Sequence, residues 1–266
     1  MKLAVHQTAG YPENPEANLA ELERTAERAA GEGADLLVLP EMWLTGYNIG
    51  NTVWELAEPA DGKAAARIAE IARERELAIL YGYPERAGGF VYNAAQLIDH
   101  DGVRRTNMRK AHLFGDEERR LFRAGDHELS VVECAGLRLG ILICYDVEFP
   151  EAVRTLALRG AEAVLVPTAL FQPFSFVATH VVPVRAWENS VYVAYANRCG
   201  TEGEMTYVGR SAICSPNGEF LAVGAEGEAL LTATVNPQEF KRHDPAGNTY
   251  LADRRPELYT ENRRPE

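Results

Sequence analysis

The chain has 266 residues, of which 46% are hydrophobic, so it is long enough for one large α/β domain or two small ones with a substantial core. Its 27 Lys and Arg residues against 39 Asp and Glu residues give a formal net charge of −12. Nucleic acids and anionic membranes bind proteins through clustered basic residues. We therefore expect neither of them as a partner.

The cysteine content indicates reduced thiols. The four cysteines, at positions 134, 144, 199 and 214, form no C-x-x-C pair, so a zinc or redox motif has little support. No signal peptide precedes the first expected strand, and no apolar run reaches transmembrane length. We therefore expect a cytoplasmic protein.

Strand and helix patterns alternate along the first half of the chain. Strands are predicted near 2–8, 36–40 and 78–83 and from 90 to 99, with helices near 15–30 and 61–75 and a turn from 84 to 89. A polar and basic stretch from 107 to 114 is expected to be a loop.

The second half continues the alternation. A hairpin is predicted from strands near 129–134 and 137–143, followed by a helix that begins at Pro150, a favoured first helical residue. Strands near 163–167 and 191–197 flank a helix near 176–189, and short strands near 210–215, 219–223 and 229–235 close the domain. No linker or low-complexity segment divides the chain.

A weak internal similarity links the two halves. The segment from Gly33 to Pro40 resembles the segment from Gly160 to Pro167, and each is a predicted strand that follows a helix and ends with proline. Two related halves that face each other would explain this similarity, and chance is the alternative for so short a match.

One thiol has an informative position. Cys144 ends an apolar run from Leu137 that is typical of a buried parallel strand, and ligand sites in α/β sheets form at the carboxyl ends of such strands. Cysteine is also the most nucleophilic side chain once it is deprotonated. Taken alone, however, a cysteine is more often a small buried hydrophobic residue.

Two further segments favour a reactive thiol. Glu41 directly follows an apolar strand that ends at Pro40, and Lys110 lies at the centre of the polar stretch 107–114. A carboxylate can accept the thiol proton. An ammonium group can stabilise charge that develops on a substrate oxygen. The three side chains are those of a cysteine hydrolase that attacks an amide-like carbon.

At these positions the chain resembles the nitrilase superfamily of carbon–nitrogen hydrolases. The pattern of that superfamily is a Glu after an LLVLPE strand, a Lys in an RK.HL segment and a Cys in an ICYD elbow, here Glu41, Lys110 and Cys144. The resemblance implies a single domain over 1–266 and an α/β fold, the four-layer α-β-β-α sandwich with two central mixed sheets. The pattern of elements alone indicates only an α/β fold with two sheets or one long sheet.

The resemblance also implies an activity. It is nearest to amidases that convert short aliphatic or ω-amino carboxamides to a carboxylate and ammonia through a cysteine thioester. Such a reaction needs no metal and no organic cofactor, and its partner is a small-molecule amide. Hydrolysis of an N-carbamoyl amine, such as N-carbamoylputrescine, is the alternative. A nitrilase and a non-catalytic metabolite-binding module are weaker alternatives.

A second glutamate is expected near the lysine, as in many members of the family. Glu118 fits best by its spacing to Phe122 and Gly125, and Glu117 is the rival. An exposed acidic helix start is the structural alternative.

The substrate-binding residues are predicted from the loops around the three motifs. Tyr145 follows the nucleophile, and its backbone N–H is expected to face the oxyanion. Glu148 stands where many relatives carry Arg, and it would suit a cationic substrate end or, alternatively, cap the next helix. The other expected contacts are Tyr47, Ala169 and Phe171, with Phe174 and Phe176 nearby.

His112 is an alternative base, because a Cys–His dyad would also activate the thiol. It lies two residues beyond Lys110, and we interpret it as a residue that anchors the loop.

A homodimer or a higher homo-oligomer is also expected, with the mixed face of the 176–189 helix and the C-terminal tail, 250–266, in its contacts.

Overall fold

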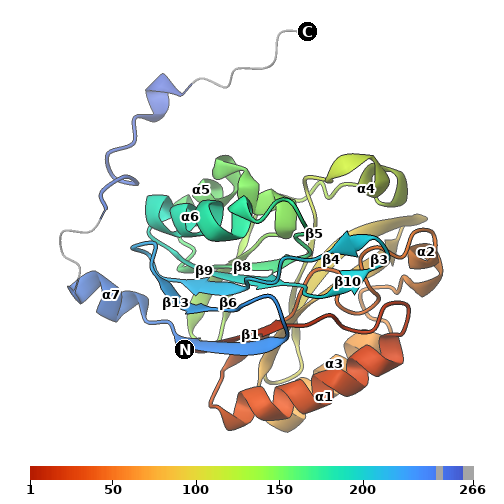
Figure 1. Ribbon diagram of the computed structural model, residues 1–266. Coiled ribbons are helices and arrows are strands. Elements are labelled where there is room, and N and C mark those ends of the chain that lie inside the picture. The colour runs from red at the N-terminus through yellow and green to blue at the C-terminus, as the bar shows by residue number, and fades with distance from the viewer. Residues whose placement is uncertain (244–247, 260–266) are drawn as a thin grey trace, which may run out of the picture.

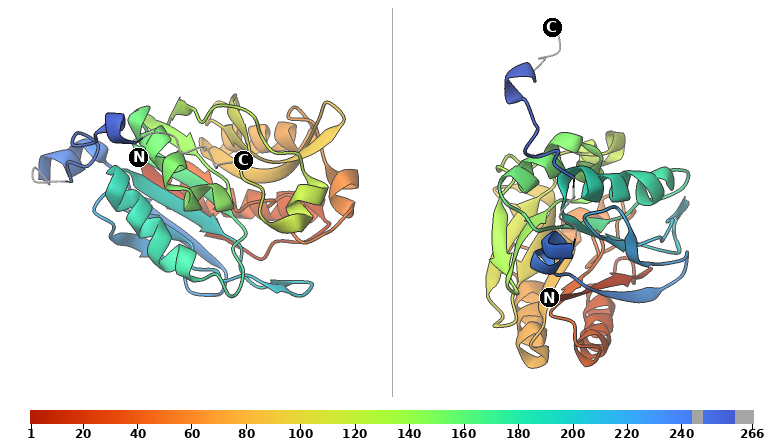
Figure 2. Two further views of the ribbon diagram at one scale, coloured as in Figure 1. Left: turned by 90° about the horizontal axis from the view of Figure 1, so that it is seen from above. Right: turned by 90° about the vertical axis from the view of Figure 1, so that its left-hand side faces the viewer.

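The computed structural model describes residues 1–243 and 248–259 as two six-stranded sheets packed face to face between two layers of helices (Figures 1 and 2). This arrangement confirms the predicted α-β-β-α sandwich. Within the described ranges, no helix combines the length and apolarity that crossing a membrane requires.

The first sheet has the strand order β14-β1-β2-β3-β4-β5, in which β1, β2 and β3 are parallel and the outer strands are antiparallel. Helices α1 and α3 connect the parallel strands and cover its outer face (Figure 1). The bounds are β1 Lys2–Gln7, α1 Pro15–Gly31, β2 Leu36–Val38, α3 Lys63–Arg75, β3 Ala78–Ala87, β4 Phe90–Ile98, β5 Arg104–Arg109 and β14 Ala229–Thr234.

The second sheet repeats this plan with the order β13-β12-β9-β8-β7-β6, and its parallel strands are β7, β8 and β9. Helices α5 and α6 cover its outer face. The bounds are β6 Val131–Cys134, β7 Leu137–Ile141, α5 Pro150–Leu158, β8 Ala163–Thr168, α6 Val182–Asn189, β9 Tyr192–Asn197, β12 Ala212–Cys214 and β13 Phe220–Val223. The similar segments 33–40 and 160–167 contain β2 and all but the last residue of β8, the middle strands of the two parallel trios.

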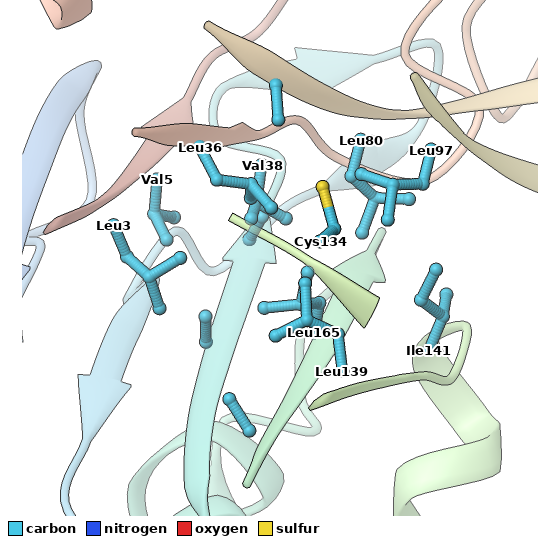
Figure 3. Close-up of a cluster of buried hydrophobic side chains, with 14 of the residues drawn as sticks. Leu3, Val5, Leu36, Val38, Leu80, Leu97, Cys134, Leu139, Ile141 and Leu165 are labelled. Carbon is cyan, nitrogen blue, oxygen red and sulfur yellow. The ribbon is translucent and has the colours of Figure 1, made fainter. Parts of the chain in front are cut away.

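The main core lies between the sheets (Figure 3). Leu36, Val38 and Leu80 of the first sheet pack against Leu139 and Leu165 of the second, and all five are fully buried. Burial of an aliphatic side chain of this size stabilises the fold by about 1.5–3 kcal/mol before the loss of chain entropy is subtracted. This apolar contact fixes the position of one sheet against the other, and with it the position of the strand ends.

Local signals explain the best-predicted helix. Asn14 caps α1 by accepting the Ala17 N–H at 3.1 Å, and Pro15 occupies the first turn. Leu22, Ala26 and Ala29 then recur at helical spacing and bury one face against the first sheet.

The predicted turn from 84 to 89 is wrong, because β3 continues to Ala87 and only the Gly88-Gly89 pair turns. Pro84 pairs with Asn93 of β4. The Pro84 carbonyl faces away from β4, toward the Glu58 N–H, and the Asn93 carbonyl faces the Lys110 N–H. The two residues therefore form a non-hydrogen-bonded pair, where a proline costs the ladder no donor.

The helix expected near 176–189 has two parts. A π-helical turn, Val177–Val181, precedes α6, and the Val182 N–H donates to the carbonyl of Val177 five residues earlier. Pro183 has no N–H to donate to the carbonyl four residues before it, and its ring pushes that carbonyl aside.

Several short elements were not predicted. Besides β5, they are α2 Thr52–Leu56, α4 Gly115–Leu121, a 3-10 helix Cys144–Glu148, the hairpin of β10 Thr201–Glu202 and β11 Met205–Thr206, α7 Pro237–His243 and a 3-10 helix Pro256–Leu258. The expected tail begins against the outer helix layer, where Tyr250 contacts Trp187 of α6 and Leu251 packs on the apolar cluster beneath the helices, and it then extends away from the sandwich (Figure 1). Residues 260–266 of that tail lie outside the described residues.

Candidate active site

The carboxyl ends of strands from both sheets meet at one place. Glu41 follows β2 of the first sheet and Ala169 follows β8 of the second, and the Glu41 N–H donates to the Thr168 carbonyl at 3.4 Å. Lys110 follows β5 and Cys144 follows β7. The structure thus brings together the three residues that the sequence motifs predict.

Glu41 is fully buried beneath this junction. Its Oε1 accepts hydrogen bonds from Lys110 Nζ and from Asn93 Nδ2, each at 2.7 Å. Burial raises the pKa of Glu41 above its usual value, although the positive charge of Lys110 acts in the opposite direction. A carboxyl group with a raised pKa is a better proton acceptor than an ordinary surface carboxylate.

Lys110 connects two buried carboxylates. Its Nζ also donates to Glu118 Oε1 at 2.6 Å, and Glu118 further accepts the Tyr47 hydroxyl and the Phe114 N–H, each at 2.7 Å. Burial by itself lowers the pKa of Lys110, but the charges of Glu41 and Glu118 outweigh burial and raise that pKa well above its usual value. Lys110 therefore keeps its positive charge in an apolar setting.

The structure distinguishes the two candidates for the second glutamate. Glu118 is buried in α4 and contacts Lys110, whereas Glu117 is exposed and pairs with Arg120. An exposed acidic helix start thus describes Glu117, while Glu118 belongs to the site.

Cys144 lies on a strained elbow. Its φ is +46°, a left-handed conformation that is rare for residues other than glycine and that turns the chain sharply from β7 into the 3-10 helix. Burial and the negative charge of Glu41 raise the pKa of the thiol well above its usual value, whereas Lys110 and a backbone hydrogen bond from Ala169 lower it. The thiol therefore depends on a neighbouring base for its deprotonation.

The elbow is held by Asp146. One carboxylate oxygen of Asp146 accepts the Ile143 N–H at 3.1 Å, and the other contacts the backbone N–H and the ring Nδ1 of His112 at 2.8 and 2.7 Å. The His112 ring also stacks on Phe149 at 3.9 Å. These contacts to Asp146 and Phe149 anchor the His112 loop to the elbow, which agrees with our interpretation of this residue.

An aromatic cavity of about 150 Å³ lies beside Glu118. Tyr47, Phe114, Phe171 and Met205 line it together with Glu118. Of the other aromatic residues considered, Tyr145 and Phe174 pack on Phe114 with ring centroids 5.2 and 5.8 Å apart, whereas Phe176 is largely exposed. The space fits a small ligand with an apolar body.

Glu148 is half-buried at the end of the 3-10 helix. Burial raises the pKa of its carboxyl group, while Lys110 and Arg185 lower it. Arg185 donates to the backbone carbonyls of Val147 and Glu148 at 2.9 and 2.7 Å, so it holds the backbone of this segment. Within the described parts of the chain the Glu148 carboxylate has no hydrogen-bond partner, so it does not cap the next helix.

Sequence reasoning missed four residues that hold the site. Asn93 contacts Glu41, and Gly82 of β3 leaves room for the Glu41 backbone. Glu202 accepts the Tyr47 N–H at 3.1 Å, and buried Arg198 donates to the Met42 carbonyl. The sequence signals for two of them were a glycine inside β3 and an asparagine inside β4, each flanked by apolar or aromatic residues.

The chain is similar to known proteins over nearly its whole length. The carbon–nitrogen hydrolase family model matches residues 2–242. A hydrolase encoded in the pqqF 5′ region of Pseudomonas protegens is 51% identical over 97% of this chain and 90% of its own length. No described group of three or more His, Cys, Asp or Glu side chains is arranged to hold a metal ion.

A solved structure agrees in fold as well. The NitN amidase from Nesterenkonia sp. AN1 is 36% identical and superposes with a TM-score of 0.87 over 97% of this chain and 98% of its own. A mutant of that amidase, at 34% identity and a TM-score of 0.87 over 97% of this chain and 95% of its own, shows covalent addition of the acetamide moiety of fluoroacetamide at the active-site cysteine. This chain belongs to the carbon–nitrogen hydrolase family, the nitrilase superfamily.

Proposed function

We propose that this protein is an amidase in which Cys144 attacks the carbonyl carbon of a linear carboxamide. The observation that carries the proposal is the buried cluster in which Lys110 contacts both Glu41 and Glu118 beside the thiol. Glu41 takes the thiol proton, the sulfur bonds to the amide carbon, and the amide oxygen becomes an oxyanion.

The reaction then proceeds in two further steps. Glu41 gives its proton to the amide nitrogen, the carbon–nitrogen bond breaks, and ammonia leaves a thioester on Cys144. A water molecule loses a proton to Glu41 and attacks the thioester carbon. The carbon–sulfur bond breaks, Glu41 returns that proton to the sulfur, and the carboxylic acid is released.

Two N–H groups are available for the oxyanion. An ammonium group has three donors, and Lys110 uses two of them on Glu41 and Glu118, which leaves one for the substrate. The Tyr145 backbone N–H lies in the first turn of the 3-10 helix, where an N–H has no acceptor within the helix. Two such donors stabilise the tetrahedral intermediate.

The cavity supports a short aliphatic acyl chain. Its volume of about 150 Å³ and its aromatic lining leave room for a few carbon atoms rather than for a peptide or an aromatic amide. Phe171 and Phe114 meet edge to face at 5.9 Å and limit the length of this chain. The covalent acetamide adduct of the related Nesterenkonia amidase supports a substrate of similar size.

Glu148 supports a cationic group at the far end of the substrate. Its carboxylate is half-buried, near the charges of Lys110 and Arg185, and has no hydrogen-bond partner within the described residues. An ammonium group on the substrate would supply that partner. We therefore propose an ω-amino carboxamide as the preferred substrate over a neutral aliphatic amide.

A panel of three substrates tests both the amidase activity and the preference for an ω-amino carboxamide. We expect ammonia release from propionamide and faster release from 5-aminopentanamide, with little from N-carbamoylputrescine. Cys144→Ala should release none while keeping its circular dichroism spectrum. Near-normal turnover by that variant, or a preference for the carbamoyl compound, would contradict the amidase assignment.

The variant Glu148→Gln tests the proposed preference for an ω-amino carboxamide, because glutamine has the same shape as glutamate but no charge. We expect its kcat/KM to fall about tenfold for 5-aminopentanamide, the effect of one charge-assisted hydrogen bond, and to stay near wild type for propionamide. An equal loss for both substrates would mean that Glu148 supports the elbow and does not recognise an amine.

A further inference from the structure

Asn93 lies inside β4 and is almost fully buried, at 1% exposure. Its Nδ2 donates to Glu41 Oε1 at 2.7 Å, and Lys110 Nζ donates to the same oxygen at the same distance. Glu41 Oε2 is equally buried and has no hydrogen-bond partner among the described residues. The two oxygens of one carboxylate thus have different surroundings.

The amide group has one favourable orientation. Rotating it by half a turn would place Asn93 Oδ1 against Glu41 Oε1, and two acceptors at hydrogen-bond distance repel each other. The backbone of Asn93 contributes as well, because its carbonyl accepts the Lys110 N–H at 2.8 Å. One residue of β4 therefore helps to place both the carboxylate and the lysine.

We propose that Asn93 is a positioning residue that holds Oε1 of Glu41 together with Lys110, so that Oε2 is the oxygen that exchanges the Cys144 proton. This inference rests on the proposed role of Glu41 as the base. Two donors occupy the acceptor positions of Oε1, so an incoming proton binds at Oε2. Rotation of the carboxylate would break both hydrogen bonds, so the same oxygen serves each proton transfer.

The proposal has a consequence for pH dependence. A donor to the charged form of a carboxyl group lowers its pKa, so Asn93 opposes the effect of burial on Glu41. A base must be deprotonated to act, and the acidic limb of kcat/KM reports the pKa of the free enzyme's base. Loss of the Asn93 donor therefore raises that pKa and moves the acidic limb to higher pH.

Other charged or titratable groups face Glu41 from the elements packed around it, and they stay in place in the test. They are Lys110 after β5, Glu118 of α4, Cys144 of the 3-10 helix, Tyr47 of the loop after β2, Tyr195 of β9 and Tyr207 after β11. The pH of the acidic limb is an apparent pKa of the whole cluster. The experiment therefore measures how far this pH differs between each variant and wild type.

The experiment compares Asn93→Leu and Asn93→Asp with wild type, using propionamide over the full pH range of activity. We expect kcat to fall about 10–100-fold and KM to change little, because Asn93 does not touch the substrate. The acidic limb should move up by about one pH unit for Asn93→Leu. It should move further for Asn93→Asp, where a second carboxyl group repels the first.

The control is Gln96→Met, which removes a buried amide from the same strand without touching Glu41. Its acidic limb should stay at the wild-type pH. Thiol titration and circular dichroism establish that each variant is folded, and the isosteric Asn93→Asp carries the test if Asn93→Leu does not fold.

Two results overturn the inference in distinguishable ways. A folded Asn93→Asp variant with the wild-type acidic limb, alongside an inactive Glu41→Gln, overturns the positioning role alone. Retained turnover by Glu41→Gln overturns the proposed function and the inference with it. A loss of stability without a displaced limb would assign Asn93 a purely structural role.

Discussion

The two halves of the sandwich share a scaffold but carry different chemistry. β2 and β8 are the middle strands of the two parallel trios. Pro40 lies just after β2, and Pro167 lies near the end of β8. The next residue is Glu41 in the first half and Thr168 in the second, and the two meet through a backbone hydrogen bond. Equivalent strand ends therefore place a buried carboxylate in one half and a backbone acceptor in the other.

The comparison shows how the functional groups are divided. The first half holds the charged cluster of Glu41, Lys110 and Glu118. Asn93 of β4 donates a hydrogen bond to Glu41 of this cluster. The second half supplies the strained elbow of Cys144. The charge network and the strained cysteine come from different sheets, and the apolar core between the sheets fixes their relative position. No single strand therefore has to carry both.

The largest effect on kcat is expected from removing the positive charge of Lys110, which belongs to the first half. In Lys110→Met the oxyanion loses one of two donors, and kcat should fall by about 10²–10³-fold in steady-state assays. The variant also leaves Glu41 and Glu118 buried without a cation, which costs about 3–5 kcal/mol of unfolding free energy in urea titrations.

The matched control is Arg109→Met. Arg109 precedes Lys110 and pairs with Glu85 at 2.7 Å outside the cluster, so its loss should leave kcat near wild type. Comparable losses in the two variants would show that the segment, and not the Lys110 charge, supports the reaction.

A smaller effect on kcat is expected from displacing the Glu41 segment within the first half. A Cβ on Gly82 would lie 2.5 Å from Met42 N, 2.6 Å from the Pro40 carbonyl and 2.8 Å from Glu41 Cα. Gly82→Ala should displace the base by a fraction of an ångström and lower kcat by about 10–100-fold. Overpacking should also cost about 1–3 kcal/mol of stability.

Gly31→Ala is the control for Gly82→Ala, because a Cβ there meets no atom within 4 Å. It should leave both kcat and the urea midpoint close to wild type. An active Gly82→Ala enzyme with an unchanged midpoint would mean that the Glu41 segment can move without consequence.

The smallest effect on catalysis is expected in the outer helix layers, which differ between the halves. Leu158 of α5 and Val184 and Trp187 of α6 are 40–50% exposed, whereas no large hydrophobic residue of α1 or α3 is exposed to this extent. Exposed apolar residues on one layer favour an isologous contact with a second copy. A dimer through the 176–189 helix and the C-terminal tail stays a prediction.

Light scattering of the full chain should give the mass of a dimer, and a chain ending at Thr249 should shift toward monomer or aggregate. A monodisperse monomer of the full chain at micromolar concentration would refute the prediction.

The sequence motifs predicted Glu41, Lys110 and Cys144, and the family resemblance that these motifs carry implied the four-layer fold, whereas the pattern of elements alone indicated only an α/β fold. Apolar strands that stop at a polar or reactive residue are visible without coordinates, and three such motifs in one order are specific to the family. Glu118 was favoured over Glu117 by spacing alone, and the structure places Glu118 against Lys110. The π-helical turn and the continuation of β3 through Pro84 were not predicted, because each depends on the local pairing of backbone groups.

The tertiary structure alone decided how these residues act on one another. The contact of Asn93 with Glu41 spans 52 positions and that of Glu202 with Tyr47 spans 155, so no local pattern indicates either. Strand periodicity determines which side chains point inward, but sheet pairing and the packing of one sheet on the other determine which of them meet. The sequence by itself therefore determined the chemical groups, and the packing of the two sheets decided which oxygen, donor and thiol face one another.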